Sequence, residues 1–70
     1  MAEAGLGNHL KVHRAKKDLT QEGLAELVGV TRPTISFVEN RRFVPSALLA
    51  LKIATVFEVP FEEVFFLEEE

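Results

Sequence analysis

The fold is decided by the stretch LTQEGLAELVGVTRPTISFVENRR, residues 19–42, which holds two helix starts separated by a glycine. Thr20 and Thr31 are good N-cap residues, and apolar side chains follow each of them at helical spacing. Gly29 lies between the two apolar sets and can adopt the left-handed conformation that ends one helix and turns the chain into the next. The sequence therefore predicts a helix-turn-helix, with helices over residues 20–28 and 31–40.

The spacing within this stretch assigns a face to each helix. Counting Gln21 as the first position, the small residue Ala25 falls at the fifth, where the two helices are expected to cross closely. Ile35 and Val38 are three residues apart and share the inward face of the second helix. Pro33 falls in the first turn of that helix, where a missing amide hydrogen costs little. The remaining side chains of the second helix are left to face outward.

Length and composition limit the protein to one small domain. The chain has 70 residues, near the lower size limit for folding without disulfides or metal, and it has no cysteine. No apolar run reaches the roughly 20 residues of a membrane span, and residues 1–5 lack the features of a signal peptide. We therefore expect a cytoplasmic protein with a flexible or extended N-terminus (residues 1–7), one domain (residues 8–66) and an acidic C-terminal tail (residues 67–70).

Charge is distributed unevenly along the chain. The net charge is −3. Residues 1–57 hold all eight basic side chains and five acidic ones, a balance of +3, whereas residues 58–70 hold six glutamates and no base, a balance of −6. The basic body is compatible with nucleic-acid binding, and we expect the acidic end to lie apart from the nucleic acid. The last three glutamates are most simply a solvated end.

Three further helices are expected outside the opening stretch. Asn8 is a candidate N-cap for a first helix that runs to about residue 17, and Ser46 for a fourth helix over residues 47–57. The fourth helix is apolar almost all round, which predicts that it is central and buried. Pro60 starts a short fifth helix whose first turn carries two glutamates, matched to the positive end of the helix dipole.

The C-terminal end is more apolar than one helix face of a small monomer can bury. In a chain this small, such an excess usually marks an interface, so we expect a homodimer. The alternative is that the last apolar side chains fold back over the core. The predicted interface residues are Phe61, Val64, Phe65, Phe66 and Leu67.

Taken together, these motifs resemble those of the Cro/C1-type helix-turn-helix regulators, the xenobiotic-response-element family. The resemblance covers roughly residues 8–66. Within the family, the Val44-Pro45-Ser46 loop and the Phe-Phe-Leu-Glu-Glu ending are most similar to the very small cytolysin-repressor-type regulators, which are homodimers of the DNA-binding domain alone. The resemblance implies an all-α, compact five-helix, lambda-repressor-like fold, with a short terminal β-hairpin in some members.

The resemblance also implies a function and its residues. It implies a sequence-specific regulator, most simply a repressor, that binds double-stranded DNA at a palindromic operator as a homodimer, with the second motif helix in the major groove. The positions carried over as DNA-binding are Gln21, Thr31, Arg32, Pro33, Thr34, Ser36, Phe37, Asn40, Arg41 and Arg42. Arg14 and Glu39 occupy the positions of a structural ion pair in relatives.

Two of these residues keep alternative roles, and four positions depart from the family pattern, among them Phe37, which stands where relatives commonly have a polar residue. Arg32 fits the O6 and N7 acceptors of guanine, or else contacts a phosphate. Phe37 packs against a thymine methyl or a sugar, or else covers the edge of the core. Pro33 offers no side-chain donor or acceptor, Gly23 replaces the usual capping-box glutamate, and Glu58 stands where a helix-ending glycine is common.

Other chemistry finds little support in the sequence. His9 and His13 would share one helix face, but only Glu3 could add a nearby third ligand, so we expect no metal site. No nucleophile with a base and no phosphate-binding loop is present, so we expect neither an enzyme nor a cofactor. The serious alternative is an antitoxin or partner-binding regulatory module that docks a second protein through the acidic, Phe-rich C-terminus.

Overall fold

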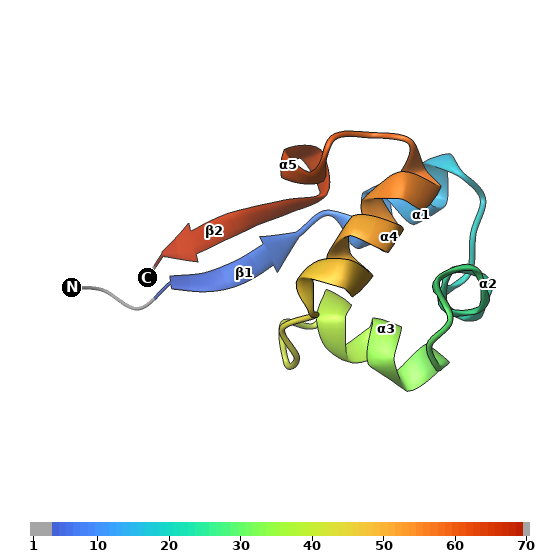
Figure 1. The fold of residues 1–70 in the computed structure, drawn as a ribbon, viewed down its shortest axis with the longest axis horizontal. Coiled ribbons are helices and arrows are strands. Elements are labelled where there is room, and N and C mark those ends of the chain that lie inside the picture. The colour runs from blue at the N-terminus through green and yellow to red at the C-terminus, as the bar shows by residue number, and fades with distance from the viewer. Residues whose placement is uncertain (1–3, 70) are drawn as a thin grey trace.

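The computed structural model describes residues 4–69, which form a mostly helical domain with a short two-stranded antiparallel sheet (Figure 1). The helices gather at one end of the molecule, and the sheet projects from them as a narrow ribbon. In chain order the elements are β1 (Ala4–Asn8), α1 (Leu10–Lys16), α2 (Gln21–Val28), α3 (Arg32–Glu39), α4 (Ala47–Phe57), α5 (Phe61–Val64) and β2 (Phe65–Glu69).

The predicted helix-turn-helix is formed by α2 and α3. The Thr20 hydroxyl accepts a hydrogen bond from the Gly23 amide (2.9 Å), so this cap forms without the capping-box glutamate. Gly29 ends α2 in the left-handed conformation (φ 77°), as predicted. Thr31 has extended backbone before α3 but makes no side-chain capping hydrogen bond. The turn and the first of the two expected caps are therefore confirmed.

The core is built around one face of α4. That face contributes Leu49, Ala50, Ile53, Ala54 and Phe57. Other helices add to the same cluster, among them α1 with Leu10, α2 with Leu24 and α3 with Ile35. The prediction that α4 is central and buried is correct for that face only, because Leu48 and Leu51 are 65% and 54% exposed. One face of α4 is enough to close so small a core, and its other face lies at the surface.

The two strands pair opposite ends of the chain. β1 runs antiparallel to β2, with Leu6 opposite Leu67 and Gly7 opposite Phe66. This sheet differs from a terminal β-hairpin, in which both strands would come from one end of the chain. The expected domain boundaries, after residues 7 and 66, both fall within strands. Residues 1–3 and 70 lie outside the described part. The pairing needs a glycine at position 7, because a Cβ there would overlap the ring of Phe66. A glycine that is poor in a helix makes room for a cross-strand aromatic ring.

The first helix begins two residues later than its predicted cap. Asn8 ends β1, and its Oδ1 accepts from the Leu10 amide (3.1 Å). Its Nδ2 donates to the Val38 carbonyl (2.9 Å). Asn8 therefore links the strand, the start of α1 and the C-terminal half of α3, in place of the simple capping role that the sequence suggested.

Several helix ends use a non-glycine residue in the left-handed conformation. Asp18 (φ 56°), Arg41 (φ 61°) and Glu58 (φ 60°) are the three such residues in the described chain. Glu58 ends α4, so the turn expected to favour glycine forms here with a glutamate. Its carboxylate lies 2.7 Å from the Lys17 ammonium. The hydrogen bond from Lys17, together with its positive charge, lowers the pKa of Glu58.

Candidate nucleic-acid interface

The outward side of α3 carries most of the residues predicted to contact DNA. Ile35 and Val38 are buried, as their spacing predicts, so the helix turns most of its other side chains towards solvent. Thr31, Arg32, Pro33, Phe37 and Asn40 are exposed, and Thr34 and Ser36 are partly buried. The structure thus brings the predicted base-reading residues together along one short helix.

Side-chain hydrogen bonds orient the polar groups at both ends of this helix. The Thr31 and Thr34 hydroxyls lie 3.2 Å apart, and the Asn40 amide donates to the Ser36 hydroxyl (3.4 Å). Each of these groups keeps further donors or acceptors for a ligand. Phe37 is 50% exposed and lies outside the core cluster, so its ring is accessible to a partner.

A buried ion pair fixes α3 against α1. Arg14 Nε lies 2.6 Å from Glu39 Oε2, and Arg14 Nη2 donates to Oε1 (3.2 Å). The Gln21 amide donates to the same carboxylate (3.1 Å), and Arg14 Nη1 donates to the Leu19 carbonyl (2.9 Å). The Glu39 side chain is 1% exposed, so its charge depends on these partners. Gln21, predicted to bind a phosphate, is therefore held at the start of α2 by a contact within the protein.

The N-terminus of α2 borders a hollow of about 410 Å³. Its lining residues are Arg14, Thr20, Gln21, Glu22 and Arg32. The positive end of the α2 dipole and the Arg32 guanidinium favour an anion here, against the carboxylate of Glu22, because the charge of Arg14 is already paired with Glu39. Arg32, the first residue of α3, therefore lies beside α2 and close to Gln21.

The α3–α4 loop brings two arginines to the other end of α3. The Arg42 amide donates to the Phe37 carbonyl (2.8 Å). The Arg41 guanidinium lies 3.2 Å from the Glu68 carboxylate in β2. β2 therefore carries one residue of the acidic end, Glu68, back beside Arg41, a residue predicted to contact DNA. The sequence analysis did not predict the Arg41–Glu68 pair, because no residue pattern indicated a strand at either end of the chain.

The predicted dimer-interface residues do not form one surface. Val64 and Phe65 are buried within the protomer core, and Phe61 and Phe66 are partly buried. Leu67 is 75% exposed. Of the five predicted residues, Leu67 is therefore the one with most surface left for a partner.

The two histidines lie in separate surroundings. His13 stacks on Phe57 (ring centroids 5.3 Å apart), and its Nε2 lies 3.1 Å from the Glu63 carbonyl oxygen. His9 packs on Phe66, with centroids 4.7 Å apart. Within residues 4–69, no group of three or more His, Cys, Asp or Glu side chains could hold a metal ion. Nor does this part of the chain contain a helix that is long and apolar enough to cross a membrane.

Comparison with known sequences finds relatives whose matches span most of both chains. An uncharacterized HTH-type transcriptional regulator of Bacillus subtilis (strain 168), YgzD, is 51% identical over 63 residues, covering 90% of this chain and 96% of the relative. An uncharacterized HTH-type transcriptional regulator of Archaeoglobus fulgidus is 49% identical over 61 residues, covering 87% of this chain and 86% of the relative.

Solved structures agree with the sequence relatives. A candidate DNA-binding protein from Bacteroides fragilis superposes with a TM-score of 0.77 at 30% identity, covering 87% of this chain and 98% of the other. The restriction-modification controller protein C.AhdI from Aeromonas hydrophila gives 0.72 at 35% identity, covering 77% and 82%. Residues 10–64 match the helix-turn-helix family HTH_3. The chain therefore belongs to the HTH_3 (Cro/C1-type) family of helix-turn-helix transcriptional regulators, DNA-binding proteins whose fold and helix-turn-helix motif it shares.

Proposed function

We propose that the protein is a transcriptional repressor that binds a palindromic operator as a homodimer, with α3 in the major groove of each half-site. The observation that carries this proposal is the solvent-facing side of α3, held in place by two buried residues behind it and by the Arg14–Glu39 pair. A recognition helix must keep its register against the base edges, and a buried bidentate ion pair favours such rigidity. The proposed site of action is the cytoplasm.

The residues around the two ends of α3 are proposed to hold the DNA backbone. Gln21 keeps one amide N–H beyond its bond to Glu39, and the α2 N-terminus beside it favours a phosphate. Arg32 lines the same hollow, which supports a phosphate contact over the alternative contact to guanine. At the other end of α3, the exposed residues 40–42 supply an amide and two guanidinium groups for further phosphates.

The exposed middle of α3 is proposed to read the bases. Ser36 can donate to or accept from a base edge, and the accessible ring of Phe37 suits the methyl group of thymine. Substituting Phe37→Ala should therefore weaken operator binding by about tenfold, while the melting temperature changes little because the ring lies outside the core. Unchanged affinity together with a lower melting temperature would assign Phe37 to the edge of the core instead.

The palindrome and the dimer follow from the size of the recognition helix. α3 has eight residues and can reach only a few base pairs. Two copies related by a two-fold axis can read two half-sites about one DNA turn (~34 Å) apart, which multiplies the specificity. Any operator read in this way is palindromic.

Selection of bound duplexes from a random DNA pool tests the proposal. We expect a palindromic consensus and an affinity that falls steeply with salt. Arg42→Ala should weaken binding to all sequences alike and reduce the salt slope by about one phosphate contact. Lys17→Ala is the matched control, because it removes a basic residue that is paired with Glu58 away from α3. A consensus without symmetry would contradict the homodimer, and no enrichment at low salt would contradict DNA recognition.

The alternative, an antitoxin or partner-binding module, is favoured by one observation. Leu67 is the most exposed large apolar side chain of the described residues, and it lies in the acidic ribbon. Failure to bind DNA at low salt, together with tight binding to the product of a neighbouring gene that is lost in Leu67→Ser, would support this alternative over the repressor.

A further inference from the structure

Large apolar side chains gather on the surface formed by α2, α4 and the loop before α4. Leu27, Phe43, Leu48 and Leu51 are each between 47% and 65% exposed, and together they are half of the large apolar residues that are exposed in the described chain. We call this surface the α2–α4 face. Apolar side chains scattered singly over a surface need no explanation, whereas a contiguous group indicates a binding site.

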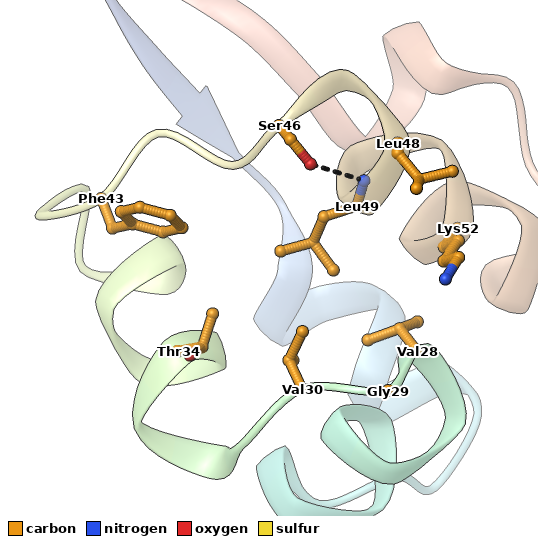
Figure 2. A pocket seen from close by; sticks show the side chains of 9 residues that line it. All are labelled: Val28, Gly29, Val30, Thr34, Phe43, Ser46, Leu48, Leu49 and Lys52. Atoms are coloured by element: carbon orange, nitrogen blue, oxygen red, sulfur yellow. Dashed lines mark hydrogen bonds between the residues drawn. The ribbon is translucent and has the colours of Figure 1, made fainter.

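The α2–α4 face contains two hollows that share a wall. One of about 300 Å³ is bordered by Val30, Thr34, Phe43 and Leu49 (Figure 2). The other, of about 490 Å³, is bordered by Leu27, Leu51 and Val56. Both hollows are lined by Val28, Gly29, Leu48 and Lys52. The face is thus an apolar groove with the exposed side chain of Leu48 between its two halves.

We propose that the α2–α4 face binds the same face of a second copy of this chain and forms the homodimer interface. This inference rests on the proposed function, and it replaces the C-terminal interface that the sequence suggested. A two-fold interface must be complementary to itself, so a projecting side chain needs a hollow on the same surface. Leu48 supplies the projection, and the hollows beside it supply the space.

Charge complementarity favours this face over the terminal ribbon. The α2–α4 face carries both signs at its border, since Glu26 and Lys52 line the same hollow. Residues 58–70 carry six glutamates and no base, so a dimer formed through that end would bring two acidic segments together. Like charges placed opposite each other are destabilising, whereas a surface with both signs can pair with itself.

The position of the face suits a dimer that also binds DNA. Thr34 of α3 lines one of the hollows, so a partner seated there lies directly beside the recognition helix. Phe37 and the arginines of the α3–α4 loop line neither hollow, so they stay free for DNA. The two recognition helices would then lie on the same side of the dimer, as two half-sites about one DNA turn (~34 Å) apart require.

The size and centre of the proposed interface indicate which substitution should weaken the dimer most. A standard interface buries about 800 Å² on each partner, roughly one-sixth of the 4847 Å² exposed by this protomer. Leu48, on the outer side of α4, lines both hollows, so it lies at the centre of the proposed interface. Central, desolvated residues dominate the binding energy of an interface.

Light scattering on the full-length chain after size exclusion tests the proposal with Leu48→Glu. The wild type should elute with twice the protomer mass of 7.8 kDa, and Leu48→Glu should raise the dimer dissociation constant by about 30-fold or more. Leu67→Glu is the matched control, because it places the same charge on the most exposed leucine of the ribbon and should leave the dimer intact. If Leu48→Glu fails to fold by circular dichroism, Leu51→Glu on the same helix decides.

Three outcomes would overturn the interface: a monomeric wild type at tens of micromolar, a folded Leu48→Glu that stays dimeric, or dissociation caused by Leu67→Glu instead. DNA binding separates this inference from the proposed function. The duplexes selected from the random pool are the probe, cut to one half-site. A monomeric Leu48→Glu that binds the half-site supports both ideas, whereas a dimeric Leu48→Glu that binds the palindrome overturns the interface alone. A wild type that binds no duplex overturns the proposed function.

Discussion

Two arginine–glutamate pairs involve the C-terminal end of α3, one through Glu39 and one through Arg41, and they differ in contact length, number of contacts and exposure. The Arg14–Glu39 pair has two contacts, the shorter 2.6 Å, and its side chains are 17% and 1% exposed. The Arg41–Glu68 pair has one contact of 3.2 Å between side chains that are 54% and 39% exposed. The first joins two helices of the core, whereas the second joins a surface loop to the terminal ribbon.

The difference separates an architectural charge from an available one. Breaking a buried ion pair leaves an uncompensated buried charge, so Arg14 must stay paired with Glu39 for the fold to be stable. An exposed pair contributes little net free energy because water and salt compete with it. Arg41 can therefore exchange the Glu68 carboxylate for a DNA phosphate at small cost. The predictions that follow test this comparison.

The largest effect is expected from Glu39→Ala. This substitution leaves Arg14 without its carboxylate and Gln21 without its acceptor, so the free energy of unfolding should fall by about 3–5 kcal/mol. Urea unfolding at a fixed protein concentration measures the loss. Glu22→Ala, which removes an exposed glutamate from the first turn of α2, should cost less than about 1 kcal/mol. A loss that small for Glu39→Ala would mean that the buried pair behaves like a surface pair.

A smaller loss is expected when the ribbon that carries Glu68 is disturbed. Gly7→Ala places a methyl group against the Phe66 ring, which must move, and should cost about 1–2 kcal/mol. Gly5→Ala is the control, since a Cβ there lies 4.0 Å from the Glu68 carbonyl oxygen, an ordinary contact. Combining Gly7→Ala with Phe66→Ala should cost less than the two single losses added together. Strict additivity in urea unfolding would show that the ring does not lie over Gly7.

The same contrast explains what the sequence could and could not predict. Thr20, Gly29 and the pair Ile35 and Val38 act within a few residues, so capping, turn and core face were predictable from local patterns. The contact between Gly7 and Phe66 joins residues at opposite ends of the chain, and neither end carries a strand pattern that would reveal it. For the same reason the sequence did not reveal the Arg41–Glu68 contact, which places one acidic residue beside the loop that we propose contacts DNA.

For α4, the sequence showed which residues are apolar, but it did not show how many sides of the helix pack against other elements. From sequence alone, a helix that is apolar on all sides is predicted to be buried on all sides. In a domain of 70 residues, one face of α4 closes the core, and Leu48 and Leu51 are left at the surface. The excess of apolar surface predicted at the C-terminus remains there mainly at Leu67, because Val64 and Phe65 are buried, and the exposed leucines of α4 were not foreseen.

Removing the exposed carboxylate should change DNA binding more than stability. Glu68→Gln frees Arg41 for a phosphate, so affinity for the selected operator should rise by about two- to fivefold at low salt, within the range of an exposed pair. The gain should shrink as salt rises. Glu62→Gln removes the same charge from the exposed first turn of α5 and is the matched control. Equal gains from both variants, measured by fluorescence anisotropy, would indicate a general effect of net charge instead of a contact at Arg41.

The smallest effect concerns the other exposed pair, Lys17–Glu58, which has no proposed contact with DNA. Because Lys17 lowers the pKa of the Glu58 carboxyl in the folded protein, the pair stabilises the fold above the ordinary pKa of 4.5, and this contribution is lost as the pH falls through the lowered value. Wild type and Glu58→Gln should therefore differ slightly in unfolding free energy at pH 7 and converge at strongly acidic pH, with the same operator affinity at pH 7. A difference that grows as the pH falls would reverse the sign of the pKa shift. A change in operator affinity would show that the Lys17–Glu58 pair affects DNA binding although Lys17 has no proposed contact with DNA.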